Sequence, residues 1–283
     1  MIDKKKKRPI RRPSEVKRPK RTEERPLILI SNDDGIGAAG IKALKRSIKR
    51  LGDVYVVAPD RERSAASHSL TLHRPLRVDE VAPGEFAVDG TPTDCIIIAV
   101  NRLLPRMPDL IVSGINNGGN LGEDISYSGT VSAAVEGTLL GIPSIAVSLV
   151  GRADFDFGQA AAFTIKVARE VLKRGLPVNT LLNVNVPRTR FVRSAKDGSL
   201  KARPLKKPLI TTQGKRVYGG DVIIEKLDPR GRKYYWIGGD MLHWDGDDNC
   251  DFAAIADDRI SITPVQLDMT CYREISELEK WKF

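Results

Sequence analysis

Two adjacent carboxylates follow the first apolar run of the chain. Asp33 and Asp34 come directly after residues 26–31, within the string Ser-Asn-Asp-Asp-Gly. Neighbouring carboxylates repel each other unless a cation lies beside them, and hard oxygen ligands of this kind suit Mg²⁺ or Mn²⁺. The pair therefore indicates a divalent metal site, although the same residue types also form ordinary solvated turns.

A second polar segment follows the next apolar run, residues 54–58, and extends from Asp60 to His68. The carboxyl ends of parallel strands meet at one edge of a sheet, where open α/β folds bind ligands. From there Ser64 is predicted to reach the metal, although a serine in this place also caps a following segment. His68 has no partner that the sequence identifies, so a hydrogen-bonded loop residue is its simplest interpretation.

A third segment, residues 113–131, is rich in Gly and Asn. The side chains of Asn116 and Asn120 offer neutral oxygens to a cation. Ser128, Gly129 and Thr130 stand where a new helix is expected to begin, and the backbone N–H groups of a helix start attract a phosphate. The alternative is an N-cap serine in a flexible loop.

A competing motif overlaps the first segment. Gly35, Gly37 and Gly40 match G-x-G-x-x-G, and Asp60 stands about 20 residues further on, as in dinucleotide-binding proteins. In that fold a pyrophosphate lies against the helix N-terminus, and here Asp33 and Asp34 would repel it. A non-hydrolytic nucleotide- or NAD(P)-binding module is therefore the alternative function.

The elements that position these residues alternate between strands and helices. Short continuous apolar runs predict strands buried on both faces, and apolar residues three and four apart predict amphipathic helices. Strands are expected at 26–31, 54–58, 110–113 and 144–149, with helices at 36–51, 95–104 and 130–140. This order predicts an α/β, Rossmann-like, doubly wound and mostly parallel sheet.

The later part of the chain has a different character. Residues 201–240 are rich in Pro, Lys and Gly around two short runs, 222–225 and 233–237, which predict a protruding β hairpin. A final strand at 260–264 and a charged helix at 272–282 are expected to follow. We expect one domain over residues 26–283, with residues 265–283 as a C-terminal oligomerisation element.

The net charge of +10 is concentrated in the N-terminal tail. Residues 1–25 hold 12 Lys or Arg and 4 Asp or Glu, a net of +8, which leaves +2 for the rest of the chain. Such a tail cannot bury enough apolar surface to fold, so we expect it to be disordered. Contact with a nucleic acid is expected only through this tail.

Two further observations bound the class of protein. No apolar stretch is long enough to span a membrane and no secretory signal is evident, so the expected location is the cytoplasm. Cys95, Cys250 and Cys271 show no metal-binding spacing and are expected to be reduced thiols.

Several strings in the right order make the chain resemble the SurE family of stationary-phase survival proteins, from about residue 27 to about residue 270. They are the strings at 31–35, 57–64, 90–95, 112–116, 128–136 and 233–236. The resemblance implies a 5′-nucleotidase, with 3′-nucleotidase and exopolyphosphatase activity within the family's range. It also implies one Mg²⁺ or Mn²⁺ ion, and a homodimer or tetramer joined through the hairpin and exchanged C-terminal elements.

Carried over by position, the family's metal ligands are Asp33, Asp34, Ser64 and Asn116, and the two aspartates are the expected catalytic residues. The expected phosphate- and substrate-binding residues are Asn32, Asn120, Ser128, Gly129 and Thr130. The chain departs from the family at Asn117 and Gly119, in the acidic stretch 243–249 and in its basic tail.

Overall fold

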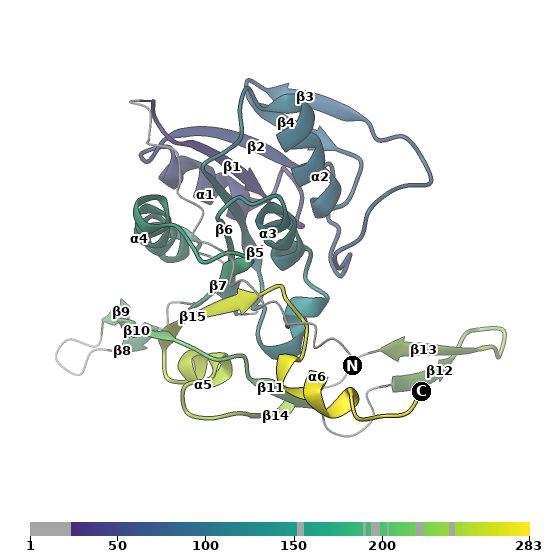
Figure 1. The fold of residues 1–283 in the computed structure, drawn as a ribbon. Coiled ribbons are helices and arrows are strands. Elements are labelled where there is room, and N and C mark those ends of the chain that lie inside the picture. The colour runs from purple at the N-terminus through teal and green to yellow at the C-terminus, as the bar shows by residue number, and fades with distance from the viewer. Residues whose placement is uncertain are drawn as a thin grey trace, which may run out of the picture.

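A nine-stranded sheet forms the centre of the computed structural model, which describes residues 24–151, 156–188, 191–193, 199–202, 204–218, 223–237 and 241–283 (Figure 1). Six neighbouring strands of this sheet are parallel, and an antiparallel pairing follows at each end of that block. In spatial order the strands are β10 (Lys206–Ile210), β15 (Arg259–Gln266), β7 (Thr180–Pro187), β6 (Ser144–Val150), β5 (Leu110–Asn117), β1 (Leu27–Ser31), β2 (Asp53–Pro59), β4 (Glu85–Val88) and β3 (Val78–Ala82).

The chain winds in two directions from β1. It first adds β2 and β4 on one side, and then returns to add β5, β6 and β7 on the other side. All five residues of β1 are buried, which agrees with a strand that is covered on both faces. The switch in direction lies between β1 and β5, and a doubly wound sheet opens a crevice at such a point.

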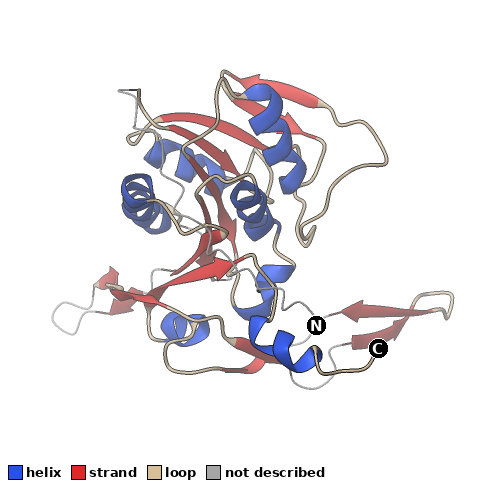
Figure 2. Cartoon of the chain, viewed as in Figure 1, coloured by secondary structure: helices blue, strands red, loops and turns tan. Residues whose placement is uncertain are grey.

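Helices cover both faces of the sheet (Figures 1 and 2). On one face α1 (Ala39–Ile48) and α4 (Gly158–Arg174) pack on side chains such as Ile28 of β1. On the other face α2 (Pro92–Ile98) and α3 (Gly129–Leu139) pack on side chains such as Leu29. Because side chains alternate along a strand, one strand contributes to both cores.

The remaining elements are short helices, helical turns and two-stranded pairs. Two short helical turns, Ala99–Leu103 and Gly122–Ser126, follow α2 and β5. Three two-stranded pairs are β8 (Phe191–Arg193) with β9 (Leu200–Ala202), β11 (Lys215–Tyr218) with β14 (Met241–Asp245), and β12 (Ile223–Leu227) with β13 (Lys233–Ile237). The last two helices are α5 (Asp251–Ala256) and α6 (Tyr272–Leu278), and the β12–β13 pair extends away from the body (Figure 1).

The expected fold class is confirmed, with differences in detail. The first helix begins at Ala39 instead of residue 36, and the helix expected at 95–104 begins at Pro92 and widens into a π-helical turn after Ile98. The sequence interpretation omitted ten of the described strands and helices, which are β3, β4, β7, β8, β9, β10, β11, β14, α4 and α5. The tail through residue 23 and hairpin residue 222 lie outside the described residues, so the division into tail and domain stays a prediction.

None of the helices within these described ranges is long and apolar enough to cross a membrane.

Two glycines of the G-x-G-x-x-G string provide a matched test of the packing. A Cβ atom on Gly40 would lie 2.0 Å from the backbone oxygen of Ile115, whereas one on Gly37 would meet nothing within 4 Å. We expect Gly40→Ala to lower the free energy of unfolding by about 2 kcal/mol or more, because α1 must move away from β5. Gly37→Ala should stay within about 0.5 kcal/mol of the parent. Urea denaturation measures both, and equal losses would contradict this packing.

Candidate functional site

The polar segments predicted from sequence meet at the switch point of the sheet. Ser31 of β1 pairs with Ser113 of β5, so the residues that follow the two strands emerge side by side. A cavity of about 340 Å³ opens there. It is lined by Asp33, Asp34, Glu62, Ser64, Ala65, Asn116, Asn117, Gly119, Asn120, Asp124, Tyr127 and Ser128.

The two carboxylates at this point are held by different partners. Asp33 is 5% exposed and accepts a hydrogen bond from the hydroxyl of Thr130, on the first turn of α3. Asp34 is more exposed and accepts a hydrogen bond of 3.2 Å from the backbone N–H of Asn117, the last residue of β5. Both carboxylates therefore depend on segments distant in sequence for their positions.

Burial and like charge disfavour ionisation of the pair. Burial raises the pKa of Asp33, and hydrogen bonds from the side chain and backbone of Thr130 oppose that rise. Burial, together with the charge of Asp33, raises the pKa of Asp34 to about 6. A cation beside the two groups would remove this conflict, because it favours the charged form of each carboxylate.

An irregularity in β5 turns Asn116 toward the cavity. The pairing register between β5 and β6 shifts between Ser113 and Asn116, and such a bulge re-aims the side chains that follow it. Gly114 adopts φ +131° within this bulge, and a Cβ there would lie 2.3 Å from the backbone oxygen of Val147. The amide nitrogen of Asn116 donates to the backbone oxygen of Gly118 at 2.8 Å, which leaves its oxygen to act as a ligand.

Ser64 reaches the same cavity from the segment after β2. Its hydroxyl donates its proton in a hydrogen bond of 2.6 Å to the carboxylate of Glu62. A hydroxyl that donates its proton to a carboxylate keeps its oxygen lone pairs for another partner. This arrangement suits a neutral ligand to a cation.

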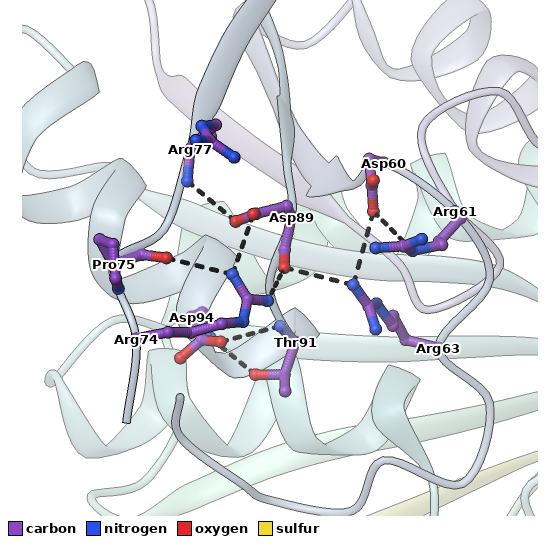
Figure 3. Close-up of polar contacts among 9 residues, drawn as sticks. All are labelled: Asp60, Arg61, Arg63, Arg74, Pro75, Arg77, Asp89, Thr91 and Asp94. Carbon is purple, nitrogen blue, oxygen red and sulfur yellow. Dashed lines mark hydrogen bonds and ion pairs between the residues drawn. The ribbon is translucent and has the colours of Figure 1, made fainter. Parts of the chain in front are cut away.

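An arginine network anchors the segment that carries Ser64 (Figure 3). The backbone N–H of Arg63 donates to the backbone oxygen of Asp33 at 2.7 Å, and its guanidinium donates to the backbone oxygen of Asp89 at 3.2 Å. The carboxylate of Asp89 also accepts from the Arg74 guanidinium at 2.9 Å and from the backbone N–H of Arg77 at 2.8 Å. Arg63 therefore links Ser64 both to β1 and to the end of β4.

The far end of this segment is attached to the start of α3. Ser67 donates through its backbone N–H to the oxygen of Tyr127 at 3.2 Å, and through its hydroxyl to the oxygen of Ser126 at 2.8 Å. His68 lies 2.8 Å from the carboxylate of Glu136 on α3. The structure thus supplies the partner for His68 that the sequence did not identify.

The start of α3 forms one wall of the site. Ser128 is the N-cap, and its hydroxyl accepts from the backbone N–H of Val131 at 3.1 Å while the residue also lines the cavity. A Cβ on Gly129 would lie 2.7 Å from the Cβ of Asp33, so only glycine allows the helix to begin this close to the carboxylate. Both alternatives considered for Ser128, a helix cap and a cavity residue, describe it.

Three expected substrate-binding residues are buried and already hydrogen bonded within the protein. Thr130 is fully buried and engages Asp33, and Asn32 is fully buried, donating to the backbone oxygen of Gly35 at 3.0 Å. Neither lines the cavity. Asn120 does line it, but its amide nitrogen donates to the hydroxyl of Ser148 at 2.8 Å.

The residues of the dinucleotide motif have other roles in the structure. Asp60, which that motif would place on a ribose, lies 3.4 Å from the Arg61 guanidinium and 3.7 Å from that of Arg63 (Figure 3). Gly35 adopts φ +95° and lies against the backbone of Arg61, while Gly40 allows α1 to contact β5. These glycines therefore form the turn and the helix packing behind the carboxylate pair.

Sequence reasoning missed four polar or aromatic residues of the cavity: Glu62, Asn117, Asp124 and Tyr127. Glu62 and Tyr127 lie within the predicted polar segments, and only the folded chain shows that they face the cavity. Asp124 forms an ion pair with Arg216 of β11. Paired asparagines in the otherwise apolar run of β7 were a usable signal, since Asn183 and Asn185 both donate to the backbone oxygen of Asn120.

The oxygen donors at the cavity fit a hard divalent cation. Over the described ranges of the chain, no group of three or more His, Cys, Asp or Glu side chains is arranged to hold a metal. The candidate set instead combines the carboxylates of Asp33 and Asp34 with the neutral oxygens of Ser64 and Asn116, which share the cavity. Oxygen-only donors of this kind suit Mg²⁺ or Mn²⁺ better than softer metals.

Comparison with known proteins finds similar proteins over most of the chain. The family model described as "Survival protein SurE" matches residues 28–220. The 5′-nucleotidase SurE of Geobacter sulfurreducens is 55% identical over 90% of this chain and 93% of its own, and that of Syntrophotalea carbinolica is 51% identical over 90% and 97%. The crystal structure of the SurE protein from Aquifex aeolicus superposes with a TM-score of 0.78 at 41% identity, covering 90% of this chain and 98% of its own.

The raised pKa of Asp34 predicts a pH dependence of stability in the metal-free protein. Its pKa rises from 3.8 to about 6 on folding, so its favourable contribution is complete below about pH 4 and is lost as the pH rises through about 6. At pH 7.5, in chelator, we expect Asp34→Asn to be more stable than the parent by on the order of 1 kcal/mol, after allowance for solvent screening.

Urea denaturation between pH 4 and pH 8 measures this difference. Added Mn²⁺ should stabilise the parent and have little effect on Asp34→Asn. If the free energies of unfolding of the two proteins changed with pH in parallel, the ionised form of Asp34 would not be destabilised in the folded state, and the prediction would be wrong.

Proposed function

This chain belongs to the SurE family, and on that premise we propose that it is a 5′-nucleotidase, a phosphomonoesterase that releases phosphate from nucleoside 5′-monophosphates. The observation that carries the proposal is the convergence of Asp33, Asp34, Ser64 and Asn116 on one cavity beside the start of α3. Relatives that bear the name 5′-nucleotidase SurE match about nine-tenths of the chain at 50% identity or more. Activity on 3′-nucleotides and on polyphosphate stays a prediction, which rests on the activities that the family resemblance implies.

We propose that Asp33, Asp34, Ser64 and Asn116 hold one Mg²⁺ or Mn²⁺ ion. A bound divalent cation neutralises phosphate charge and lowers the pKa of water. Without a cation the cavity would repel its substrate, because four of its side chains are acidic and none of the described residues that line it is Lys or Arg. The acidic residues are Asp33, Asp34, Glu62 and Asp124.

The protein's own residues position the reacting groups. Thr130 and Asn117 orient the two aspartates, and Glu62 orients the hydroxyl of Ser64. The start of α3 presents the positive end of its helix dipole to the same cavity, where it favours a phosphate. Ser128 and Gly129 are the proposed contacts at this end, with Asn120 held rigidly beside them by Asn185 and Ser148.

We propose that the protein forms a homodimer or tetramer through the β12–β13 hairpin and the C-terminal helix. All ten residues of the two hairpin strands are exposed, including Trp236 at 64% and Ile237 at 86%. Helix α6 buries none of its residues, and Trp281 beyond it is 63% exposed. An exposed apolar surface of this extent, on a hairpin that projects from the rest of the protein and on the C-terminal helix, is typical of a protein interface.

Phosphate release from AMP tests the proposed reaction. In the parent, activity should disappear with chelator and return with Mn²⁺. Asp34→Asn should lower kcat/KM by about 100-fold or more, because it weakens the cation site on which phosphate binding depends. The exposed Asp79 of β3 lies outside the cavity, and Asp79→Asn is the matched control that should keep parental activity. Activity that is indifferent both to chelator and to Asp34→Asn contradicts the proposal.

The oligomer proposal has a separate test. Trp236→Glu places a charge in the exposed apolar hairpin, and we expect it to shift the protein to a smaller species in sedimentation velocity at micromolar concentration. Arg230→Glu, in the turn of the same hairpin, should leave the assembly intact. A monomeric parent, or an unchanged Trp236→Glu variant, would exclude the hairpin as the interface.

A further inference from the structure

The cavity contains a single aromatic side chain among the described residues that line it. This is Tyr127, and its neighbours on the cavity wall are acidic, amide, hydroxyl or small side chains. Tyr127 is 66% exposed. The other strongly exposed aromatic residues of the described chain, such as Trp236 and Tyr272, lie on the hairpin and on or after α6, outside the cavity.

The backbone of Tyr127 is held on both sides. Its N–H donates to the oxygen of Asp124 at 3.0 Å, and its oxygen accepts from the N–H of Ser67 at 3.2 Å. Ser67 is itself tied to Ser126 by a bond of 2.8 Å. The ring, in contrast, makes no hydrogen bond or ring contact with any described residue. Because the backbone is already fixed, a ligand that stacks on the ring would order only the side chain, which lowers the entropic cost of binding.

The position of Tyr127 matches the shape of a nucleotide. It immediately precedes Ser128, the N-cap of α3, which lies beside Asp33 and Asp34 in the cavity. An ester whose phosphate binds at the carboxylates and the helix start therefore has its organic group within reach of the ring. The acidic and amide side chains of the cavity cannot make the apolar contact that would distinguish the nucleoside part of a substrate from another alcohol.

We propose that Tyr127 is the platform on which the nucleobase stacks, and that it makes the cavity selective for nucleotides over phosphate esters that lack a base. This inference rests on the proposed nucleotidase function. Stacking on an aromatic face tolerates every base, because each base has a π-face. The platform therefore predicts broad base tolerance, with purines preferred for their larger area.

The test compares AMP with ribose 5-phosphate, which has the same sugar phosphate and no base. The measured quantity is the ratio of kcat/KM for AMP to kcat/KM for ribose 5-phosphate, at saturating Mn²⁺. Tyr127→Ala should lower this ratio by about 10-fold, within the range that one base–aromatic stack contributes. Tyr127→Phe keeps the ring and should keep the ratio, and the preference for GMP over UMP should shrink only in Tyr127→Ala.

A measurement on the parent protein complements the variants. Adenosine should inhibit hydrolysis of ribose 5-phosphate more strongly than ribose does, since only adenosine carries the stacking group. Equal inhibition by the two, or a ratio unchanged in Tyr127→Ala, overturns the inference. A parent that hydrolyses both esters but does not prefer AMP also overturns it, whereas a parent that hydrolyses neither ester refutes the nucleotidase function itself.

Discussion

Two carboxylates are held side by side at the switch point of the sheet, and the surrounding structure is arranged to keep them there. Asp33 is buried against the first turn of α3, where the side chain and backbone of Thr130 hydrogen bond to its carboxylate. Asp34 is fixed by a backbone N–H beyond the bend in β5. Burial, together with the charge of Asp33, raises the pKa of Asp34 to about 6, and a cation beside the pair would remove this cost.

That constraint explains several local features. Gly129 lets α3 begin in contact with Asp33, and Gly40 lets α1 lie against the backbone of β5. The bulge in β5 turns Asn116 to the same side as the aspartates. These are close approaches of backbone to backbone or to carboxylate, and each depends on a residue without a side chain or on a break in regular pairing.

The segment from Asp60 to His68 depends on a different set of contacts. Arg63 ties it to Asp33 and to the oxygen of Asp89, while Ser67 and His68 tie it to the start and middle of α3. The segment thus spans from the proposed metal ligands to the proposed phosphate site (Figure 3 shows the arginine end). Ser64 and the backbone of Tyr127 are positioned by the two ends of one loop, so the proposed metal site and the proposed base platform share a single support.

The sequence by itself determined the fold class, the alternation of strands and helices around β1, β2, β5 and β6, and the candidate ligands. Continuous apolar runs such as residues 27–30 mark buried strands, and adjacent carboxylates after such a run mark a cation site, because these signals depend on neighbours in the chain. Only the tertiary structure decided that Asp60 belongs to an arginine network, that Thr130 serves Asp33, and that Glu62, Asp124 and Tyr127 face the cavity. Those assignments depend on which segments the sheet brings together at its switch point. The spacing of residues along the chain does not give the distance between side chains on different strands.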